Sequence, residues 1–523
     1  MAFNSYGFAL LFLPIVFALY RLAALLRGPG ARLLVVIAAG LVFYALACAW
    51  ALPVLLISLV GNYAVAGRIA ATQGTTQRGW LIFGVTANVA ALVIYKFTGF
   101  FGANLALVMP GFMAAGGAAS RLWRELALPL GISFFTFQQI SLLVDVARGL
   151  VPQLRPLTYL ASILFFPYLV SGPITYYREF APQIEAEPRD WLRNGITGIT
   201  LFSVGLFKKT LLADSLILWV DPMFADVATG KSPVAVQAWV MVAGFLMQMY
   251  FDFSGYSDMA AGVARLFGVR LPLNFYSPMR VTSIMDWWRR WHMSLGRFVN
   301  DYIFQSLALP LTRKAVMRGH GRWGVMVLGV LMPTAVSMLV IGAWHGGRWT
   351  YIVFGLLHAV YMVVAEAWLF WRKKNRKHKG AAAPSRLDHV RGHVLTILCV
   401  LVALVPFRAA DMASALRIWG AMVGFNGSAV WLPWPVMAPV GAGLVAVELA
   451  AALFIVYALP NTAQWLDRLD PSLPFAGGDK VSRGPFGWRW RAGLGWGLLT
   501  GAALMLGLTF VSRGANSFVY FSF

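Results

Sequence analysis

Three histidines stand in strongly apolar sequence, where an imidazole is unexpected: His292, His345 and His358. Ionisable side chains at membrane depth are costly and by default indicate a functional site. A neutral imidazole can take the proton from an attacking hydroxyl group and return it to a leaving group. His345 is the main candidate, because Trp344 would give it an apolar wall and the glycine pair after it would allow close backbone approach. The alternative is a structural histidine bonded to a neighbouring helix.

The other two histidines rank below His345. His292 lies in segment 286–295, which is rich in tryptophan and arginine and is typical of an anchor at the membrane interface. His358 lies in the centre of an apolar run, and we interpret it as a helper or a structural partner. The remaining histidines are expected to be solvated: His320, His378, His389 and His393.

A further polar island, residues 248–258, carries Asp252, Ser254 and Asp258. Two carboxylates six residues apart would lie on roughly opposite sides of a helix, so a carboxylate dyad is not expected. The Ser254-Gly255 step is predicted to break the helix between them. The two carboxylates would either line a polar tunnel or form buried salt bridges, and both readings stay open. A structural ion-pair cluster is predicted upstream, formed by Lys208, Lys209 and Asp214.

Arginines Arg289, Arg290 and Arg297 could hold the phosphates of coenzyme A or of a phosphopantetheine arm. The alternative is that they only follow the bias of basic residues toward the cytoplasm. The chain has no glycine-rich phosphate loop and no nucleophile-elbow serine motif, so a covalent acyl-serine is not indicated. Its two cysteines both lie in apolar runs, which excludes a disulfide framework and a cysteine-based zinc site, and no metal site is expected.

Composition indicates what must position these residues. Of 523 residues, 59% are hydrophobic and only 12% are charged, against about 25% charged in soluble domains. Apolar runs of about 18 residues or more recur along the chain, so we predict an all-α polytopic integral membrane protein. The net charge of +23 does not point to nucleic acid, because the basic residues sit in short connectors between the apolar runs.

We expect about 10–13 spanning helices, with re-entrant and interfacial helices around a central tunnel. Segment 101–120 is ambiguous, with a re-entrant piece as one interpretation, and segment 265–322 is interpreted as interfacial and half-inserted helices on the cytoplasmic side. Proline and glycine in segment 165–174 predict a helix break, which at membrane depth needs protein or a water cavity around it. The predicted spans are 8–26, 33–50, 51–66, 80–95, 201–219, 235–250, 323–341, 349–371, 394–405, 436–459 and 494–511.

Basic clusters set the predicted orientation. Segment 372–379 is the strongest of them and places its connector in the cytoplasm, beside anionic lipid. The hydrophilic loop 460–491 is then also inside, and both chain ends are outside.

Several motifs together resemble the membrane-bound O-acyltransferase family, MBOAT, and most closely its bacterial branch that acetylates exopolysaccharides. The ordered set covers the chain from about residue 128 to the end and is far more specific than any single piece. The matching pieces are Leu130–Gln138, Phe166–Ile174, Gly205–Asp214, Tyr250–Asp258, Trp288–Leu295, Trp344–Gly346, Gly355–His358, Phe407–Asp411, Leu459–Thr462 and Phe518–Phe523.

The resemblance implies a single MBOAT membrane domain over 1–523, with N-terminal helices in 1–127, a catalytic core in 128–371 and C-terminal helices in 394–523. It implies that His345 is the invariant family histidine, that His292 is a second one, and that Gln138 and Trp344 support the site or line its tunnel. It further implies a bacterial inner-membrane enzyme that moves an acetyl group toward hydroxyls of an alginate- or cellulose-like exported polysaccharide. The expected donor is acetyl coenzyme A or another acyl thioester, with no permanently bound cofactor. The expected partners are a periplasmic acetyltransferase and the polysaccharide export or synthase machinery.

Two alternatives remain. The first is D-alanyl transfer to teichoic acid, which differs in its donor, a carrier protein in place of coenzyme A. The second is a transporter or flippase for lipid-linked sugars, which would use the same polar islands without chemistry. The absence of a recognisable internal repeat weakens the transporter reading.

Overall fold

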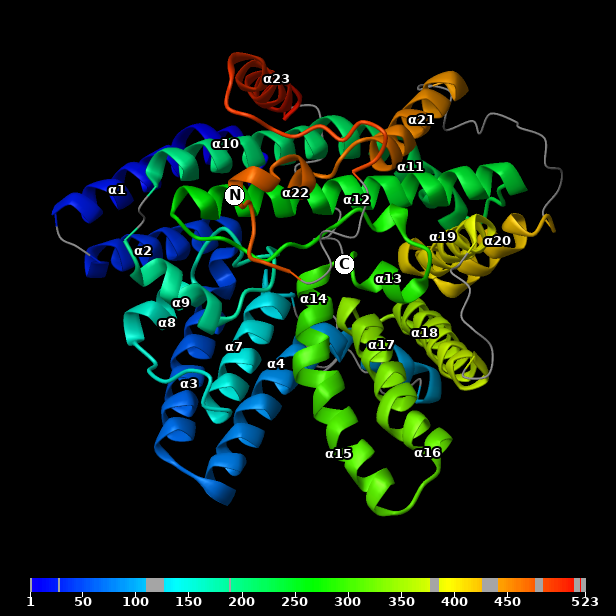
Figure 1. Ribbon diagram of the computed structural model, residues 1–523, viewed down its shortest axis with the longest axis horizontal. Helices are drawn as coiled ribbons and strands as arrows, with labels where there is room; N and C mark the ends of the chain where they lie inside the picture. The colour runs from blue at the N-terminus through cyan, green and yellow to red at the C-terminus, as the bar shows by residue number, and fades with distance from the viewer. Residues whose placement is uncertain are drawn as a thin grey trace.

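The computed structural model describes residues 2–26, 29–109, 127–187, 190–376, 385–425, 441–475, 483–511 and 518, and the side chains of 26, 29 and 373–376 are left aside. Within these residues the chain is helical and forms no strand. Figure 1 shows two long helices, α10 and α12, running side by side across the molecule, with helical hairpins extending from them on one side. The all-α fold is therefore confirmed.

The N-terminal helices form one end of the molecule. A π-helical turn Gly7–Phe12 leads into α1 (Leu13–Leu26), followed by α2 (Pro29–Cys48), α3 (Leu52–Ala71) and α4 (Gly74–Val108). The helix α4 is continuous well beyond the predicted span 80–95, because segment 93–108 contains neither a proline nor a basic cluster that would end it. Residues 110–120 of the ambiguous segment lie outside the described residues.

The helix α7 (Ile132–Ala147) begins at Gly131, whose φ of 73° is left-handed. A side chain on Gly131 would also meet the backbone of Leu169 and Val170, so this position requires glycine. After α8 (Pro156–Ile163), residues 164–176 are buried and form no helix, which confirms the predicted break. The short helix α9 (Tyr177–Glu185) follows.

The centre of the fold is a pair of closely packed helices. The first is α10 (Trp191–Phe207), extended through a π-helical turn (Lys208–Ala213) into α11 (Asp214–Ala228), and the second is α12 (Ala235–Leu266). A side chain at Gly205 or Gly255 would collide with the opposite helix, so small residues permit this contact. The predicted break at Ser254-Gly255 is wrong, because Gly255 packs against α10 within an uninterrupted helix.

Short elements follow, as expected for segment 265–322. They are η4 (Pro278–Arg280), α13 (Ile284–Trp288), α14 (Met293–Phe298), a π-helical turn (Val299–Phe304), α15 (Gln305–Met317) and α16 (Arg322–Met326). A further π-helical turn (Val327–Leu331) leads into α17 (Met332–His345), which ends at the main candidate residue.

The C-terminal part adds α18 (Trp349–Arg376), α19 (Arg386–Arg408), α20 (Met412–Met422), α21 (Ala442–Ala458), α22 (Thr462–Trp465), η8 (Asp467–Leu469) and α23 (Leu494–Phe510). His378, most of the basic segment 372–379 and residues 519–523 of the last motif lie outside the described residues, as does the C-terminus.

Six stretches of the described chain are long and apolar enough to cross a membrane: Gly7–Leu25, Gly30–Ala71, Gly74–Val108, Arg322–His345, Trp349–Arg372 and Arg386–Arg408. The second of them contains both α2 and α3. Shorter apolar helices are α7, α21 and α23. The helices α10, α11 and α12 are not among the six, and α12 carries Asp252 and Asp258 of the polar island 248–258. The chain is a multi-pass membrane protein.

Candidate active site

The three histidines that the sequence singles out meet at one small cavity. His292, His345 and His358 all line a space of about 30 Å³, here called the histidine cavity. They come from the start of α14, the end of α17 and the middle of α18, and all three side chains are buried. Residues far apart in the sequence are thus assembled into a site with room for about one water-sized group.

His345 sits in a box of aromatic rings at the end of α17. The rings of Trp344 and Phe407 lie 4.9 and 4.8 Å from its imidazole, centroid to centroid, and Phe354 lies 5.9 Å away. Gly346, at a φ of 156°, turns the chain directly after it. The helix end therefore presents an imidazole in apolar surroundings, which disfavour a charged ring.

His292 is held by an unusual backbone and by an amide. Its φ of 45° is left-handed, which is rare for a residue with a side chain and is often found at functional sites. Its Nδ1 lies 3.0 Å from Oδ1 of Asn274, and the ring of Phe253 packs at 4.7 Å. Burial lowers the pKa of His292 to about 3, so the ring stays neutral at physiological pH.

His358 is fixed in one tautomer by Trp288. The indole Nε1–H can only donate, and it lies 3.3 Å from Nδ1 of His358. The neutral ring therefore carries its proton on Nε2. Trp288 is at the same time a wall of the histidine cavity.

A larger space, here called the arginine cavity, is also lined by Trp288 and has a volume of about 720 Å³. Arg289 and Arg297 line it, but Arg290 does not. Arg297 already forms a two-pronged pair with Glu179 at 2.5 and 2.9 Å, and Arg290 pairs with Asp286 at 2.9 Å. The side chain of Arg289 is exposed. Of the three arginines proposed for the donor, Arg289 is thus the best placed to meet a phosphate.

The tryptophans of segment 286–295 do not anchor the chain at the membrane surface. Trp287 and Trp291 are buried and stack on each other at 5.2 Å, and with Trp288 they line the histidine cavity. The anchor interpretation is wrong because composition alone does not distinguish an interfacial tryptophan from one that lines a cavity.

A third space, here called the lysine cavity, has a volume of about 160 Å³ and is lined by Trp344, His345 and Lys96. Lys96 donates from Nζ to the backbone oxygen of Trp344, and its Nζ lies 5.2 Å from the centre of the indole ring. The sequence analysis missed Lys96, which directly follows the predicted span 80–95. The signal was there: it is the only lysine of α4, a long apolar helix.

The three cavities lie in series. Trp288 is common to the walls of the arginine and histidine cavities, and His345 is common to those of the histidine and lysine cavities. His345 is therefore the residue at which the histidine cavity and the lysine cavity adjoin.

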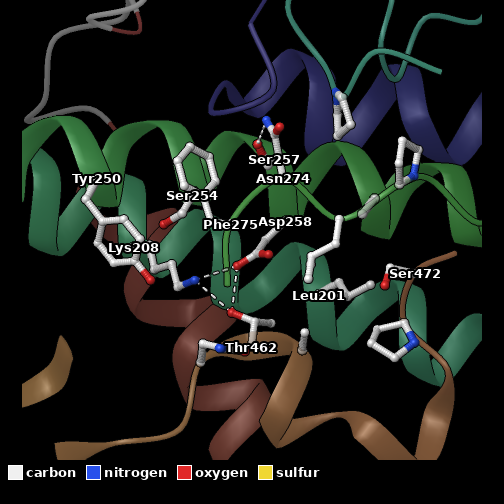
Figure 2. Close-up of a pocket in the computed structure, with 17 residues that line it drawn as sticks. Leu201, Lys208, Tyr250, Ser254, Ser257, Asp258, Asn274, Phe275, Thr462 and Ser472 are labelled. Carbon is white, nitrogen blue, oxygen red and sulfur yellow. Dashed lines mark hydrogen bonds and ion pairs between the residues drawn. The ribbon is translucent and has the colours of Figure 1, made fainter. Parts of the chain in front are cut away.

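The polar residues of α12 lie elsewhere. Lys208 contacts Asp258 at 2.6 Å and Thr462 at 2.7 Å, as Figure 2 shows, and Asp258 and Ser254 line a separate cavity of about 30 Å³. Lys209 lies 2.7 Å from both Asp214 and Asp252. Asp252 and Asp258 are therefore both in ion pairs, as the salt-bridge alternative predicted. None of these ion-paired residues lines the histidine cavity.

Gln138 and Trp344 complete the set of predicted residues. Gln138 is buried in α7, and none of the cavities described above includes it; its Oε1 has no hydrogen-bond partner among the described residues. Trp344, at the end of α17, stacks on Phe137 of α7, with the ring centroids 5.6 Å apart. This contact couples α7 to the end of α17.

Comparison of the sequence with known proteins identifies the family of the chain. The family model of the membrane-bound O-acyltransferases, MBOAT, matches residues 121–384. A peptidoglycan O-acetyltransferase of Helicobacter pylori is 35% identical over 456 residues, which cover 82% of this chain and 80% of that protein. The chain belongs to the membrane-bound O-acyltransferase family.

Other MBOAT relatives differ in the names of their substrates. A probable alginate O-acetylase of Pseudomonas putida is 32% identical over 432 residues, covering 82% of this chain and 81% of that protein. A teichoic acid D-alanyltransferase of Bacillus subtilis is 28% identical over 351 residues, covering 63% of this chain and 82% of that protein. The resemblance drawn from the motifs is confirmed, and the chain is an acyltransferase.

Proposed function

We propose that this MBOAT protein transfers an acetyl group from a cytoplasmic thioester donor, acetyl coenzyme A, toward hydroxyl groups of an exported polysaccharide. The observation that carries the proposal is the place of His345, which lines both the histidine cavity and the lysine cavity. A residue between two cavities can meet a donor that arrives from one side and an acceptor that arrives from the other.

The donor enters through the arginine cavity. Its walls combine segments 285–304 and 473–475, and both belong to parts of the chain that their basic residues assign to the cytoplasm. Arg289 has an exposed side chain in the wall of this cavity, and its guanidinium can bind the donor's phosphates. The thioester end passes Trp288 to reach His345, and since the histidine cavity holds only about 30 Å³, side chains of its wall must shift as the acyl group arrives.

The acceptor hydroxyl reaches His345 from the lysine cavity. The neutral imidazole takes the hydroxyl proton while the oxygen attacks the thioester carbonyl carbon, and the C–S bond then breaks. The leaving thiolate takes the proton back from the imidazolium. The products are a free thiol and an acetyl ester, and the imidazole returns to its starting state.

The acceptor belongs to a cell-surface glycan or to a periplasmic partner that passes the acetyl group on. Support comes from the relatives named for peptidoglycan and alginate O-acetylation, each of which covers 82% of this chain. The proposal therefore places the chain in a bacterial inner membrane, beside the polysaccharide export or synthase machinery.

D-alanyl transfer is the second candidate, since a teichoic acid D-alanyltransferase is 28% identical over 63% of this chain. The lower identity and shorter coverage favour acetyl transfer. The transporter alternative loses its ground, because the chain is an acyltransferase by family.

The identity of the thioester donor distinguishes acetyl transfer from D-alanyl transfer. Purified protein in liposomes would be given acetyl coenzyme A or a D-alanyl carrier-protein thioester, and thiol release would be followed with an oligosaccharide acceptor present. We expect thiol release and acetylated acceptor with acetyl coenzyme A. Turnover only with the D-alanyl thioester would replace the proposal by its alternative.

A further inference from the structure

Asn274 lies in the non-helical segment between α12 and η4, and its side chain is buried. On one side it borders the cavity of Figure 2, which shows its amide beside Ser257. On the other side it contacts His292, a wall of the histidine cavity. The amide thus forms the partition between an ion-paired cavity and the candidate active site.

The hydrogen bonds fix which atom of the amide faces His292. The backbone N–H of Ser294 can only donate, and it lies 3.3 Å from Oδ1 of Asn274. The hydroxyl of Ser294 donates to the same oxygen at 2.9 Å, and Nδ2 donates to Ser257 at 3.0 Å. The amide cannot be turned round without facing a donor with a donor.

This orientation sets the protonation of the ring. Nδ1 of His292 lies 3.0 Å from the same Oδ1, so it carries the proton and donates. A neutral imidazole carries only one N–H proton, and here that proton is on Nδ1. Nε2 is therefore a hydrogen-bond acceptor, on the side of the ring away from Asn274. The left-handed backbone at His292 and the ring of Phe253 fix the direction of the side chain.

His358 shows the opposite arrangement in the same cavity, because the indole of Trp288 donates to its Nδ1 and leaves the proton on Nε2. In the histidine cavity, Asn274 therefore makes Nε2 of His292 an acceptor, and Trp288 makes Nε2 of His358 a donor.

We propose that Asn274 is a positioning residue for acyl transfer, whose amide oxygen holds His292 as a hydrogen-bond acceptor beside His345. The proposal rests on the proposed function of the histidine cavity. Without the amide oxygen, His292 can place its proton on Nε2 and present a donor, in place of an acceptor, beside His345. Asn274 does not touch the reacting atoms and acts through His292 alone.

Two substitutions separate this role from a structural one. Asn274→Ala removes the amide oxygen, and we expect turnover to fall about 10- to 100-fold, less than the loss of about 10²–10⁴ for a general base itself, with the donor KM unchanged. Asn274→Asp keeps an acceptor of the same shape but adds a negative charge. A carboxylate favours the imidazolium of His292 and raises its pKa, so the acid limb of the rate–pH profile should move to higher pH.

The other titratable and charged groups around His292 are the same in both variants. They are His345 at the end of α17, His358 on α18 and Lys96 on α4, which reaches the backbone of Trp344. The ion pair of Lys208 and Asp258, in the cavity that Asn274 borders, is also common to both variants. A shift of the profile in Asn274→Asp is therefore assigned to the new charge.

A double-mutant cycle tests whether Asn274 affects turnover through His292. In a His292→Ala background, Asn274→Ala should cost no further turnover, because the ring that it orients is gone. Asn62→Ala is the matched control: Asn62 is also buried and bonds to another asparagine, Asn88, at 3.3 Å, but neither residue lines any of the cavities described above. It should lower the unfolding temperature and leave turnover and the pH profile as in the wild type.

Three results would overturn the proposal: full turnover of Asn274→Ala, an unchanged pH profile of Asn274→Asp, or an additional loss in the double variant equal to the single loss. If Asn274→Ala does not fold, the profile of the isosteric Asn274→Asp decides alone. A wild-type protein that shows no thioester turnover would instead contradict the proposed function, so the two failures are distinguishable.

Discussion

Replacing Lys209 by methionine should destabilise the protein strongly without touching the histidine cavity. The Lys209 side chain has no exposed surface, and its ammonium lies 2.7 Å from Asp214 and 2.7 Å from Asp252, whose side chains are 5% and 1% exposed. Removing one partner of a buried pair leaves an uncompensated charge and costs about 3–5 kcal/mol. In Lys209→Met two carboxylates lose their shared partner, so the upper end of this range is expected.

The assay is thermal unfolding of purified protein in one detergent, followed by tryptophan fluorescence. Unfolding entropy of about 2.1 cal/mol/K per residue makes each kcal/mol worth about 1 °C in a chain of 523 residues. The expected drop for Lys209→Met is therefore about 5 °C. Arg155→Met is the control, because that pair with Glu185 is 55% and 30% exposed and such pairs contribute only about 0–1 kcal/mol.

A neutral replacement of the whole cluster should restore most of the loss. In Lys209→Met combined with Asp214→Asn and Asp252→Asn no buried charge remains within this cluster, and such replacements are often near neutral. A drop for Lys209→Met no larger than that for Arg155→Met would refute this account of the cluster.

Two further predictions concern the substrate path. Arg289→Glu should raise the KM for acetyl coenzyme A by about 10-fold or more, while Arg290→Glu should change it less, because Arg290 is paired with Asp286 outside the arginine cavity; equal donor KM values for the two variants would contradict the assignment. Lys96→Met should lower kcat by about 10-fold or more at unchanged unfolding temperature, because it removes the half-buried cation that contacts the end of α17 beside His345; wild-type kcat in a saturated assay would show that Lys96 only fills space.

The sequence predicted the membrane class and the helical fold, and it singled out the three histidines that line one cavity, because each of these depends on local pattern or on rarity. An imidazole inside an apolar run is conspicuous wherever the run ends up in space. The buried turn at 164–176 was also predictable, because proline and glycine act on their own backbone.

What the sequence could not predict depends on contacts between distant segments. Gly255 was taken for a helix breaker, but the close approach of α10 explains it. Lys96 and Asn274 gain their importance only from Trp344 and His292, which lie far along the chain. Similarly, nothing in the run of arginines showed that Arg297 would be taken by Glu179.

The central claim, that His345 carries the proton during acyl transfer, is tested most directly by the turnover of His345→Gln. Glutamine keeps similar volume and hydrogen bonding in the aromatic box but cannot cycle a proton. Acetyl transfer from acetyl coenzyme A would be measured on protein that inserts and purifies like the wild type. The account predicts a loss of about 10²–10⁴-fold in rate, whereas near-normal turnover would show that His345 is a packing residue and move the role to His292 or His358.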